Sequence, residues 1–441
     1  MTGIALGTTI FIVLMVLLVL RVPIGMAMFT VGAAGYCYLA GTEVILNVLK
    51  HLAYARLSNY DLVVIPLFLL MGQLATQGGL SRTLFRLVEA FVGHLRGGVA
   101  MASIGACAGF GAICGSSVAT AATMGQVALP ELKRCGYSGA LSTGCLAAGG
   151  TLGILIPPSI PLVIYAILTQ ESIGDLFVAA IVPGAIAMLG YMLVVVAVVT
   201  FNPEAGPAGP RSNWRERLKA LRQALPLLLV FAVVIVGIYG GWANPTEAAA
   251  IGAAACALLA VTSGGMRWRG FLDSALGTAQ ATAMIFLVLL GADMLNSTLA
   301  LSNMPVELAT WVQSHAFSHV AVMGVILLMY IFLGCVMDSL AMILLTIPIF
   351  YPLVMGLDFY GLPNADKSVW FGILALMVVE IGLVHPPVGM NVFIINRLAK
   401  DVPLVETFKG VIPFLLSDFV RIILLLCFPS IALFLVHALK P

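Results

Sequence analysis

Charged residues are scarce in this chain. Asp, Glu, Lys and Arg make up 9% of the 441 residues, whereas soluble domains contain about 25%. Hydrophobic residues make up 61%, and the mean hydropathy is +1.10. The composition therefore argues against a soluble fold and indicates an all-α polytopic membrane protein, because several uncharged runs supply the roughly 20 residues that one membrane crossing needs.

The sequence also lacks the motifs of enzymes, metal knuckles and disulfide frameworks. It contains neither His-Glu-x-x-His nor Gly-x-Ser-x-Gly, and "GFGAICG" has the wrong spacing for a dinucleotide loop. Its eight cysteines lie almost all in apolar runs, without Cys-x-x-Cys spacing, so we expect packing residues. No basic stretch precedes the first run, Ile4–Leu20, which we interpret as a spanning helix and not a signal peptide. An enzyme is therefore disfavoured.

Long polar stretches are rare as well, and the main one lies near the middle. Asn202 to Gln223 is rich in Pro, Gly and Arg, which predicts a linker that runs into a short surface helix. We therefore expect a first unit over residues 1–201, a cytoplasmic linker over 202–222, and a second unit over 223–441.

The two units contain the same motifs in the same order. "GTLGILIPPSIPLVIYAI" corresponds to "VEIGLVHPPVGMNVFIIN", which pairs Gly153 with Gly382 and Pro157-Pro158 with Pro386-Pro387 at one offset. Upstream, Gly111 pairs with Gly334, Ser116 with Ser339 and Thr123 with Thr346. Further matches join "LFLLMGQLATQGGLSRTL" to "FLVLLGADMLNSTLALSN" and "VPIGMA" to "NPTEAA". Four matches in one order indicate a duplicated fold.

The charges predict that the two repeats are inserted in opposite directions. In the first repeat, Lys133-Arg134 follows the Gly/Ser segment and the acidic "TQESIGD" follows the Pro-Pro segment. The second repeat reverses this bias, with "GLDFYGLPNADKS" and then Arg397 and Lys400. Since cytoplasmic loops are enriched in Lys and Arg, we expect inverted repeats of the kind found in secondary transporters. The first hairpin then opens inward and the second outward.

Each repeat is expected to hold a re-entrant hairpin and a broken helix. The run from Gly97 to Pro130 is uncharged, yet its glycines make a poor helix interior. We predict hairpins at about 97–131 and 320–356, and broken helices at about 136–170 and 368–398. One long helix with a glycine packing face is the alternative to each hairpin, and simple kinks are the alternative to the breaks.

The breaks are the candidate sites. Proline removes a backbone donor, so carbonyls around 153–156 and 382–385 should lack partners at depth. A hard cation such as Na⁺ favours such carbonyls together with hydroxyls and carboxylates. The candidate Na⁺ ligands are Ser116, Ser117, Thr120, Thr151, Gly153, Asp338, Ser339, Thr346, Glu380 and Gly382. Helix amino termini at the same depth suit a carboxylate, and the candidate substrate residues are Pro158, Ser159, His385 and Asn391.

Ionisable side chains in apolar runs are functional candidates because insertion is costly. Asp338 and Glu380 are each a sodium ligand, a proton site or a buried partner for a backbone amide. His385 has either a substrate-contacting or titrating role or a packing role. Glu247 follows "NPT", where an acid complements a helix start. Asp61 and Asp293 are left open.

The chain resembles the large membrane subunit of tripartite ATP-independent periplasmic (TRAP) transporters. The resemblance rests on "RVPIGMA", "FGAICGSSVATAATMG", "GGTLGILIPPSIPLVIY", "NPTEAAAIGA" and "HPPVGMN", and covers essentially the whole chain. It implies a bacterial inner-membrane protein that works with a small four-helix membrane subunit and a periplasmic solute-binding protein. It also implies uptake of an organic acid, such as a C4-dicarboxylate or sialic acid, driven by two or more Na⁺ through an elevator motion.

Two other functions stay open from the residues alone. A self-sufficient sodium/dicarboxylate symporter would share this architecture and would work without a soluble protein. An intramembrane enzyme is the third hypothesis, disfavoured by the missing motifs. The acid itself, the sodium stoichiometry and the oligomeric state are not predicted.

Overall fold

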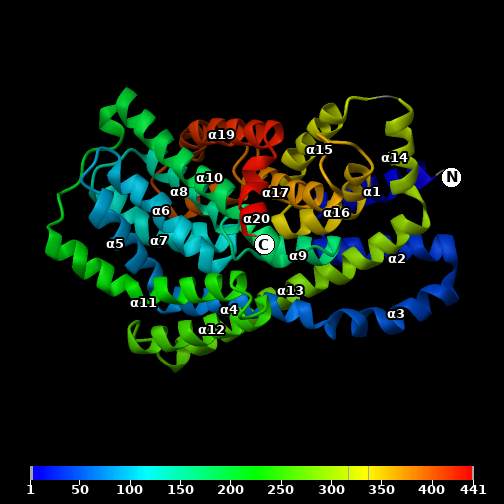
Figure 1. Cartoon of the computed structure of the whole chain (residues 1–441), viewed down its shortest axis with the longest axis horizontal. Coiled ribbons are helices and arrows are strands. Elements are labelled where there is room, and N and C mark those ends of the chain that lie inside the picture. The colour runs from blue at the N-terminus through cyan, green and yellow to red at the C-terminus, as the bar shows by residue number, and fades with distance from the viewer. Residues whose placement is uncertain (1–2, 316, 336, 440–441) are drawn as a thin grey trace.

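The computed structural model of the chain describes residues 3–315, 317–335 and 337–439. Apart from short connections, these residues form helices that pack side by side (Figure 1). The prediction of an all-α fold is therefore confirmed.

In the first half, the described residues form ten α-helices and a short 3₁₀ turn, Tyr60–Val63. The α-helices are α1 (Gly3–Val19), α2 (Ile24–Ala40), α3 (Thr42–Leu57), α4 (Val64–Gln77), α5 (Leu80–Val92), α6 (Gly98–Cys114), α7 (Ser117–Arg134), α8 (Gly139–Leu155), α9 (Ile160–Thr169) and α10 (Ile173–Phe201).

A second 3₁₀ turn, Pro203–Ala205, leads into the second half, whose described residues also form ten α-helices. These are α11 (Trp214–Tyr239), α12 (Pro245–Thr262), α13 (Trp268–Leu301), α14 (Met304–Ser314), α15 (His319–Gly334), α16 (Ser339–Met355), α17 (Asn364–Gly382), α18 (Met390–Leu398), α19 (Leu404–Cys427) and α20 (Ser430–Leu439).

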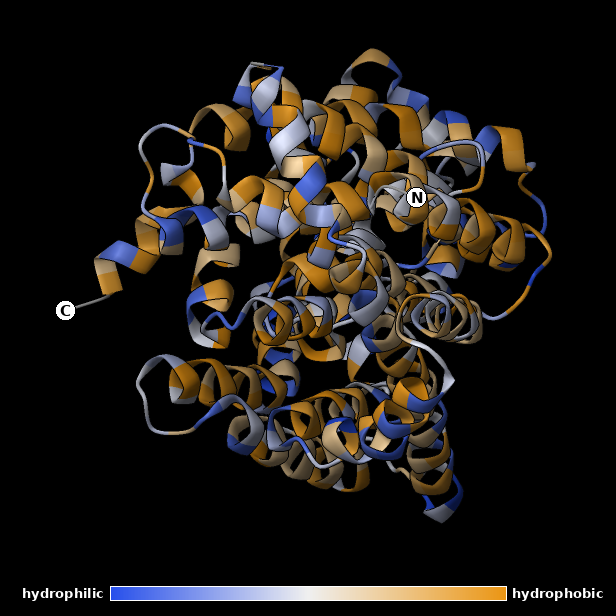
Figure 2. Cartoon of the chain, turned by 90° about the vertical axis from the view of Figure 1, so that its right-hand side faces the viewer, coloured by the Kyte–Doolittle hydropathy of each residue, from blue (hydrophilic) through white to orange (hydrophobic). Residues whose placement is uncertain are grey.

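The helices have the length and composition of membrane spans. Within the described residues, seven helical segments are long and apolar enough to cross a bilayer, the α8–α9 segment among them, and six further apolar helices are shorter. Figure 2 shows hydrophobic residues predominating along the helices. The chain is thus a multi-pass membrane protein.

Local capping explains where several helices begin and end. Gly115 adopts a left-handed φ of 62°, which suits glycine, and ends α6 at the tip of the first hairpin. Asn244 and Glu247 form a reciprocal capping box at the start of α12, with bonds of 2.8 and 2.9 Å. The structural interpretation of Glu247 is therefore confirmed.

The linker differs from its prediction in one respect. A capping box between Asn213 and Glu216 starts α11 inside the polar stretch, and the helix then continues to Tyr239 without interruption. The basic residues from Arg215 to Arg222 therefore form the first turns of a long apolar helix, and there is no separate surface helix. The cap provides the start, and Pro226 is accommodated within the helix.

The two halves pack on each other in a reciprocal pattern. Helix α2 of the first half lies along α13, and α12 of the second half lies along α4. Likewise, α18 packs on α7 and α9 packs on α16. Each pair joins helices from different repeats, so neither half builds its surroundings alone.

Candidate functional site

The first helix break lies where the sequence predicts it. Helix α8 ends at Leu155 and α9 begins at Ile160, with Pro157-Pro158 between them. Among the described residues, no donor bonds to the carbonyls of residues 153–156, because the prolines lack the N–H groups that would bond to those of Gly153 and Ile154. Four adjacent carbonyl oxygens are thus free of protein donors. The bond between the two prolines is cis, as it is between Pro386 and Pro387.

Each hairpin touches its break through a pair of glycines. A Cβ on Gly111 would collide with the Gly153 backbone. A Cβ on Gly334 would come within 2.7 Å of the Gly382 Cα. Such contacts bring a hairpin leg against the end of the broken helix at backbone distance. Gly153 and Gly382, both candidate ligand positions, therefore lie beside the hairpins in matching ways.

The hydroxyls of the first half divide into free and engaged groups. Thr120 and Ser159 are fully buried, and neither hydroxyl has a hydrogen-bond partner among the described residues. Ser116 caps α7 by accepting a 3.4 Å bond from the Ala119 N–H. The Ser116 carbonyl lies next to Gly153, and the Pro158 carbonyl lies next to Gly115 at the hairpin tip. The Ser116 carbonyl also accepts from the Thr120 N–H at 3.0 Å, so the oxygens that lack a described donor at the meeting of tip and break are the Thr120 and Ser159 hydroxyls and the carbonyls of the break.

Two candidate residues of the second half join this first group. The Asn391 amide nitrogen donates to Ser117 Oγ at 2.7 Å and to the Ala147 carbonyl at 3.4 Å. The Asn391 amide oxygen is buried and has no partner among the described residues. Glu380 is buried beside Ser117, and neither of its carboxylate oxygens makes a hydrogen bond within the described structure. Buried polar groups usually have partners, so this cluster has spare oxygen ligands.

The second hairpin is arranged differently. Asp338 caps α16 by accepting from the Leu340 and Ala341 N–H groups at 3.2 and 3.4 Å, and Ser339 is the first residue of that helix. Thr346 lies 2.7 Å from the Tyr330 hydroxyl and from the Met342 carbonyl. A ligand role for Thr346 would therefore use the oxygen lone pair that these two bonds leave over.

The second break is more fully bonded than expected. Helix α17 ends at Gly382 and α18 begins at Met390. The Asn391 N–H donates to the Leu383 carbonyl at 3.0 Å. The prediction that this carbonyl lacks a partner is therefore wrong. The longer connection is the reason, since it folds α18 back onto the end of α17. His385 bonds through Nδ1 to the adjacent Pro386 carbonyl.

A buried polar network links the first break to α19. Thr151 lies 3.1 Å from the Tyr191 hydroxyl on α10, which donates to Asp418 Oδ2 at 3.0 Å. Asp418 forms an ion pair with Arg421 at 2.7 Å, and the guanidinium lies 5.6 Å from the centre of the Tyr191 ring. Asp418, Arg421 and Tyr191 are absent from the sequence-based candidates. Asp418 and Arg421, one turn apart in an apolar run, were the signal available.

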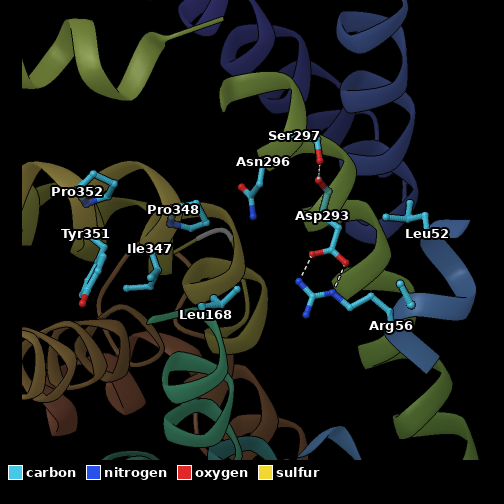
Figure 3. Close-up of a pocket in the computed structure, with 11 residues that line it drawn as sticks. Leu52, Arg56, Leu168, Asp293, Asn296, Ser297, Ile347, Pro348, Tyr351 and Pro352 are labelled. Atoms are coloured by element: carbon cyan, nitrogen blue, oxygen red, sulfur yellow. Dashed lines mark hydrogen bonds and ion pairs between the residues drawn. The ribbon is translucent and has the colours of Figure 1, made fainter. Parts of the chain in front are cut away.

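A cavity of about 590 Å³ opens between helices of different repeats (Figure 3). One wall comes from α3 and α13, where Arg56 bonds to both carboxylate oxygens of Asp293. The other wall comes from α9 and α16 and includes Leu168, Pro348 and Tyr351. Asp293, which the sequence left open, is therefore an ion-pair partner at the rim of a cavity.

Comparisons with known proteins identify the family of this chain. Residues 11–431 match the family described as "Tripartite ATP-independent periplasmic transporter, DctM component". The C4-dicarboxylate TRAP transporter large permease protein DctM of Pseudomonas aeruginosa is 35% identical over 376 residues, which cover 85% of this chain and 86% of that protein. The sialic acid TRAP transporter large permease protein SiaM of Vibrio cholerae is 29% identical over 422 residues, which cover 95% and 96%.

One solved structure supports the fold. The YdaH transporter of Alcanivorax borkumensis aligns with a TM-score of 0.59 over 88% of this chain and 89% of that one. The aligned sequences are 14% identical, so this similarity is evidence for the helix arrangement only.

Proposed function

Because the chain belongs to the DctM component family of tripartite ATP-independent periplasmic transporters, we propose that it is the large membrane subunit of a sodium-driven importer of organic acids. Its partners are a small four-helix membrane subunit and a periplasmic solute-binding protein, and its location is a bacterial inner membrane. The related permeases are named for C4-dicarboxylate and sialic acid, which supports a carboxylate as the cargo.

The free oxygens at the first break carry this proposal. The carbonyls of residues 153–156 and the buried Thr120 hydroxyl have no donor among the described residues, and unsatisfied acceptors at membrane depth are costly. Na⁺ binds oxygen ligands and would satisfy them. We place one ion there, with Ser116, Ser117 and Gly153 as further ligands and with Glu380 supplying the negative charge.

A second ion belongs to the second hairpin. Ser339 begins α16, and Gly382 meets Gly334 as Gly153 meets Gly111. Asp338 holds the tip by capping α16, which leaves the backbone around Gly382 and the Ser339 hydroxyl as the proposed ligands. Two sites in matching positions support a stoichiometry of at least two sodium ions for each solute.

The acid binds between the breaks. Helices α9 and α18 begin shortly after the Pro-Pro segments, and the N–H groups of their first turns carry partial positive charge that attracts a carboxylate. Ser159, buried at the start of α9 without a partner among the described residues, is positioned to donate. Asn391, near the start of α18, would donate to the acid by giving up its bond to Ser117 or to the Ala147 carbonyl. Pro158 and His385 flank these helix starts. Hairpins and broken helices then move together against α2, α4, α12 and α13 in an elevator motion.

Uptake into proteoliposomes tests the function. The purified chain would be reconstituted with its small subunit, and labelled succinate or sialic acid supplied with and without the solute-binding protein and an inward sodium gradient. We expect uptake only when both the gradient and the binding protein are present. Uptake without the binding protein would instead support a self-sufficient symporter, and solute conversion without uptake would support an enzyme.

Two substitutions test the sites. Ser116→Leu and Ser339→Leu place bulk at the hairpin tips, and we expect each to abolish sodium-dependent uptake while reconstitution yield stays normal. Ser263→Leu changes an exposed serine at the end of α12 and serves as the control. Normal sodium dependence in both tip variants would refute the assignment.

A further inference from the structure

The cavity of Figure 3 lies between two bodies that the proposed function sets in relative motion. Its polar wall belongs to α3 and α13, and its apolar wall to α9 and α16. A second cavity of about 620 Å³ shares Arg56 and Leu168 with it and is lined by Asn59, Asp61 and Glu171 at the end of α9. On the orientation predicted from the charges, both lie toward the outer face, where a delivered solute arrives.

Donors and acceptors in this cavity are incompletely used. Arg56 directs Nε and Nη2 to Asp293, and its Nη1 makes no hydrogen bond to a described residue. Asn296, which projects into the space in Figure 3, has a buried amide oxygen with no partner in the described structure. The Tyr351 hydroxyl, in contrast, already donates a hydrogen bond to Ser368 Oγ at 3.1 Å. The open hydrogen-bonding capacity therefore lies on the α3–α13 wall.

We propose that this cavity is an entry site for the acid, with Arg56 as the ligand of its carboxylate. A guanidinium binds carboxylates through two parallel bonds, and Arg56 already holds Asp293 in this way. The arriving carboxylate takes over these bonds from Asp293, Asn296 contacts the polar remainder of the solute, and Ile347 and Pro348 cover its apolar part. This inference rests on the proposed function, since it assigns the first contact of the imported acid.

Competition between Asp293 and the solute gives opposite predictions for two substitutions. Arg56→Gln removes the cation, so KM should rise about tenfold, as expected for a hydrogen bond to a charged group. Asp293→Asn removes the competitor and leaves Arg56 free, so KM should fall severalfold. A purely structural ion pair between α3 and α13 would make both variants worse in the same way.

The test measures KM for succinate and for N-acetylneuraminate in the reconstituted system. Lys133→Gln and Asp401→Asn make the same chemical changes in an exposed ion pair, with side chains 70% and 61% exposed, and should leave KM unchanged. A second readout is the rise in melting temperature that each acid causes in the purified protein without sodium. We expect Arg56→Gln to abolish this rise and Asp293→Asn to keep or increase it.

The outcomes separate this inference from the proposed function. Opposite shifts in KM together with a melting response that follows Arg56 support the entry site, and the melting response can be measured even if uptake proves independent of sodium. Equal shifts in one direction, no shift, or a wild-type protein that neither acid stabilises overturn it. Sodium-driven uptake with unchanged KM in both variants would leave the proposed function standing and remove the entry site alone.

Discussion

The contact between Gly111 and Gly153 gives the sharpest test of the site geometry. Gly111 lies on α6 where its missing side chain lets the Gly153 backbone approach, and an added Cβ would collide with it. Gly109 lies on the same helix, yet a Cβ there would meet only Leu84, at an ordinary 3.7 Å. Gly111→Ala and Gly109→Ala therefore make the same chemical change, the first at a crowded position and the second at an open one.

Two energy terms decide the outcome. Replacing a helical glycine by alanine gains up to about 1 kcal/mol, and this gain is common to both variants. Overpacking costs about 1–3 kcal/mol. At position 111 the added Cβ would collide with backbone atoms of Gly153, which cannot move away by a change of rotamer. The difference between the variants is therefore about 1–3 kcal/mol. If separation of α6 from α8 relieves the clash, the same energy corresponds to a sodium affinity weakened by about 5- to 150-fold.

Sodium titration of uptake measures this effect directly. We expect the half-saturating sodium concentration to rise in Gly111→Ala and to stay at the wild-type value in Gly109→Ala, which should also melt at the same or a higher temperature. The pair Gly334→Ala and Gly324→Ala repeats the comparison in the second hairpin, where position 324 is open. If the crowded and open variants showed the same sodium dependence, a backbone ion site at these contacts would be refuted.

Other predictions concern the buried polar groups. Asp418→Asn should destabilise the protein by about 3–5 kcal/mol because Arg421 loses its buried counter-ion. Thermal melting compares this single variant with the double variant Asp418→Leu/Arg421→Leu, which should be the more stable of the two. A double variant that is no more stable than the single variant would contradict the prediction. Thr346→Val should lower the stability of the protein by about 1 kcal/mol and leave the sodium dependence of uptake unchanged. Thr120→Val should change the sodium dependence and leave the stability unchanged. If the sodium titration responded to Thr346→Val and not to Thr120→Val, Thr120 would be removed from the site. Glu380→Gln should raise the melting temperature and weaken sodium-driven uptake, and wild-type uptake would exclude Glu380 as a ligand.

Local backbone chemistry made the breaks and hairpins predictable. Pro157-Pro158 cannot continue a helix, so α8 has to end close to Leu155 whatever surrounds it. Gly115 and Ser116 combine a left-handed residue with a helix cap, which makes a turn the natural outcome between two apolar legs. These features depend on a few neighbouring residues, and such residues are visible in a sequence.

Side-chain partners could not be found in the same way. Ser117 and Asn391 are far apart in the chain, and nothing in either motif shows that α18 packs on α7. Tyr191 carries no charge and looks like an ordinary membrane-helix residue until α10 meets α19. The partner of Thr346 was hidden for the same reason, because repeat symmetry pairs Thr346 with Thr123 but does not reveal the Tyr330 hydroxyl.

The reciprocal packing of the repeats bears on how the two proposed ion sites would act together. Helix α18 follows the second break but packs on α7, the second leg of the first hairpin, and α9 follows the first break but packs on α16 of the second hairpin. Asn391 adds a hydrogen bond to the first of these contacts. An ion that fixes one hairpin against its own break therefore also fixes the other repeat's half-helix. Since closely packed cores have two discrete arrangements more readily than intermediate ones, we expect both hairpins and both broken helices to move as one body. Cross-linking α7 to α18 should consequently preserve uptake, whereas cross-linking α9 to α13 across the cavity should stop it.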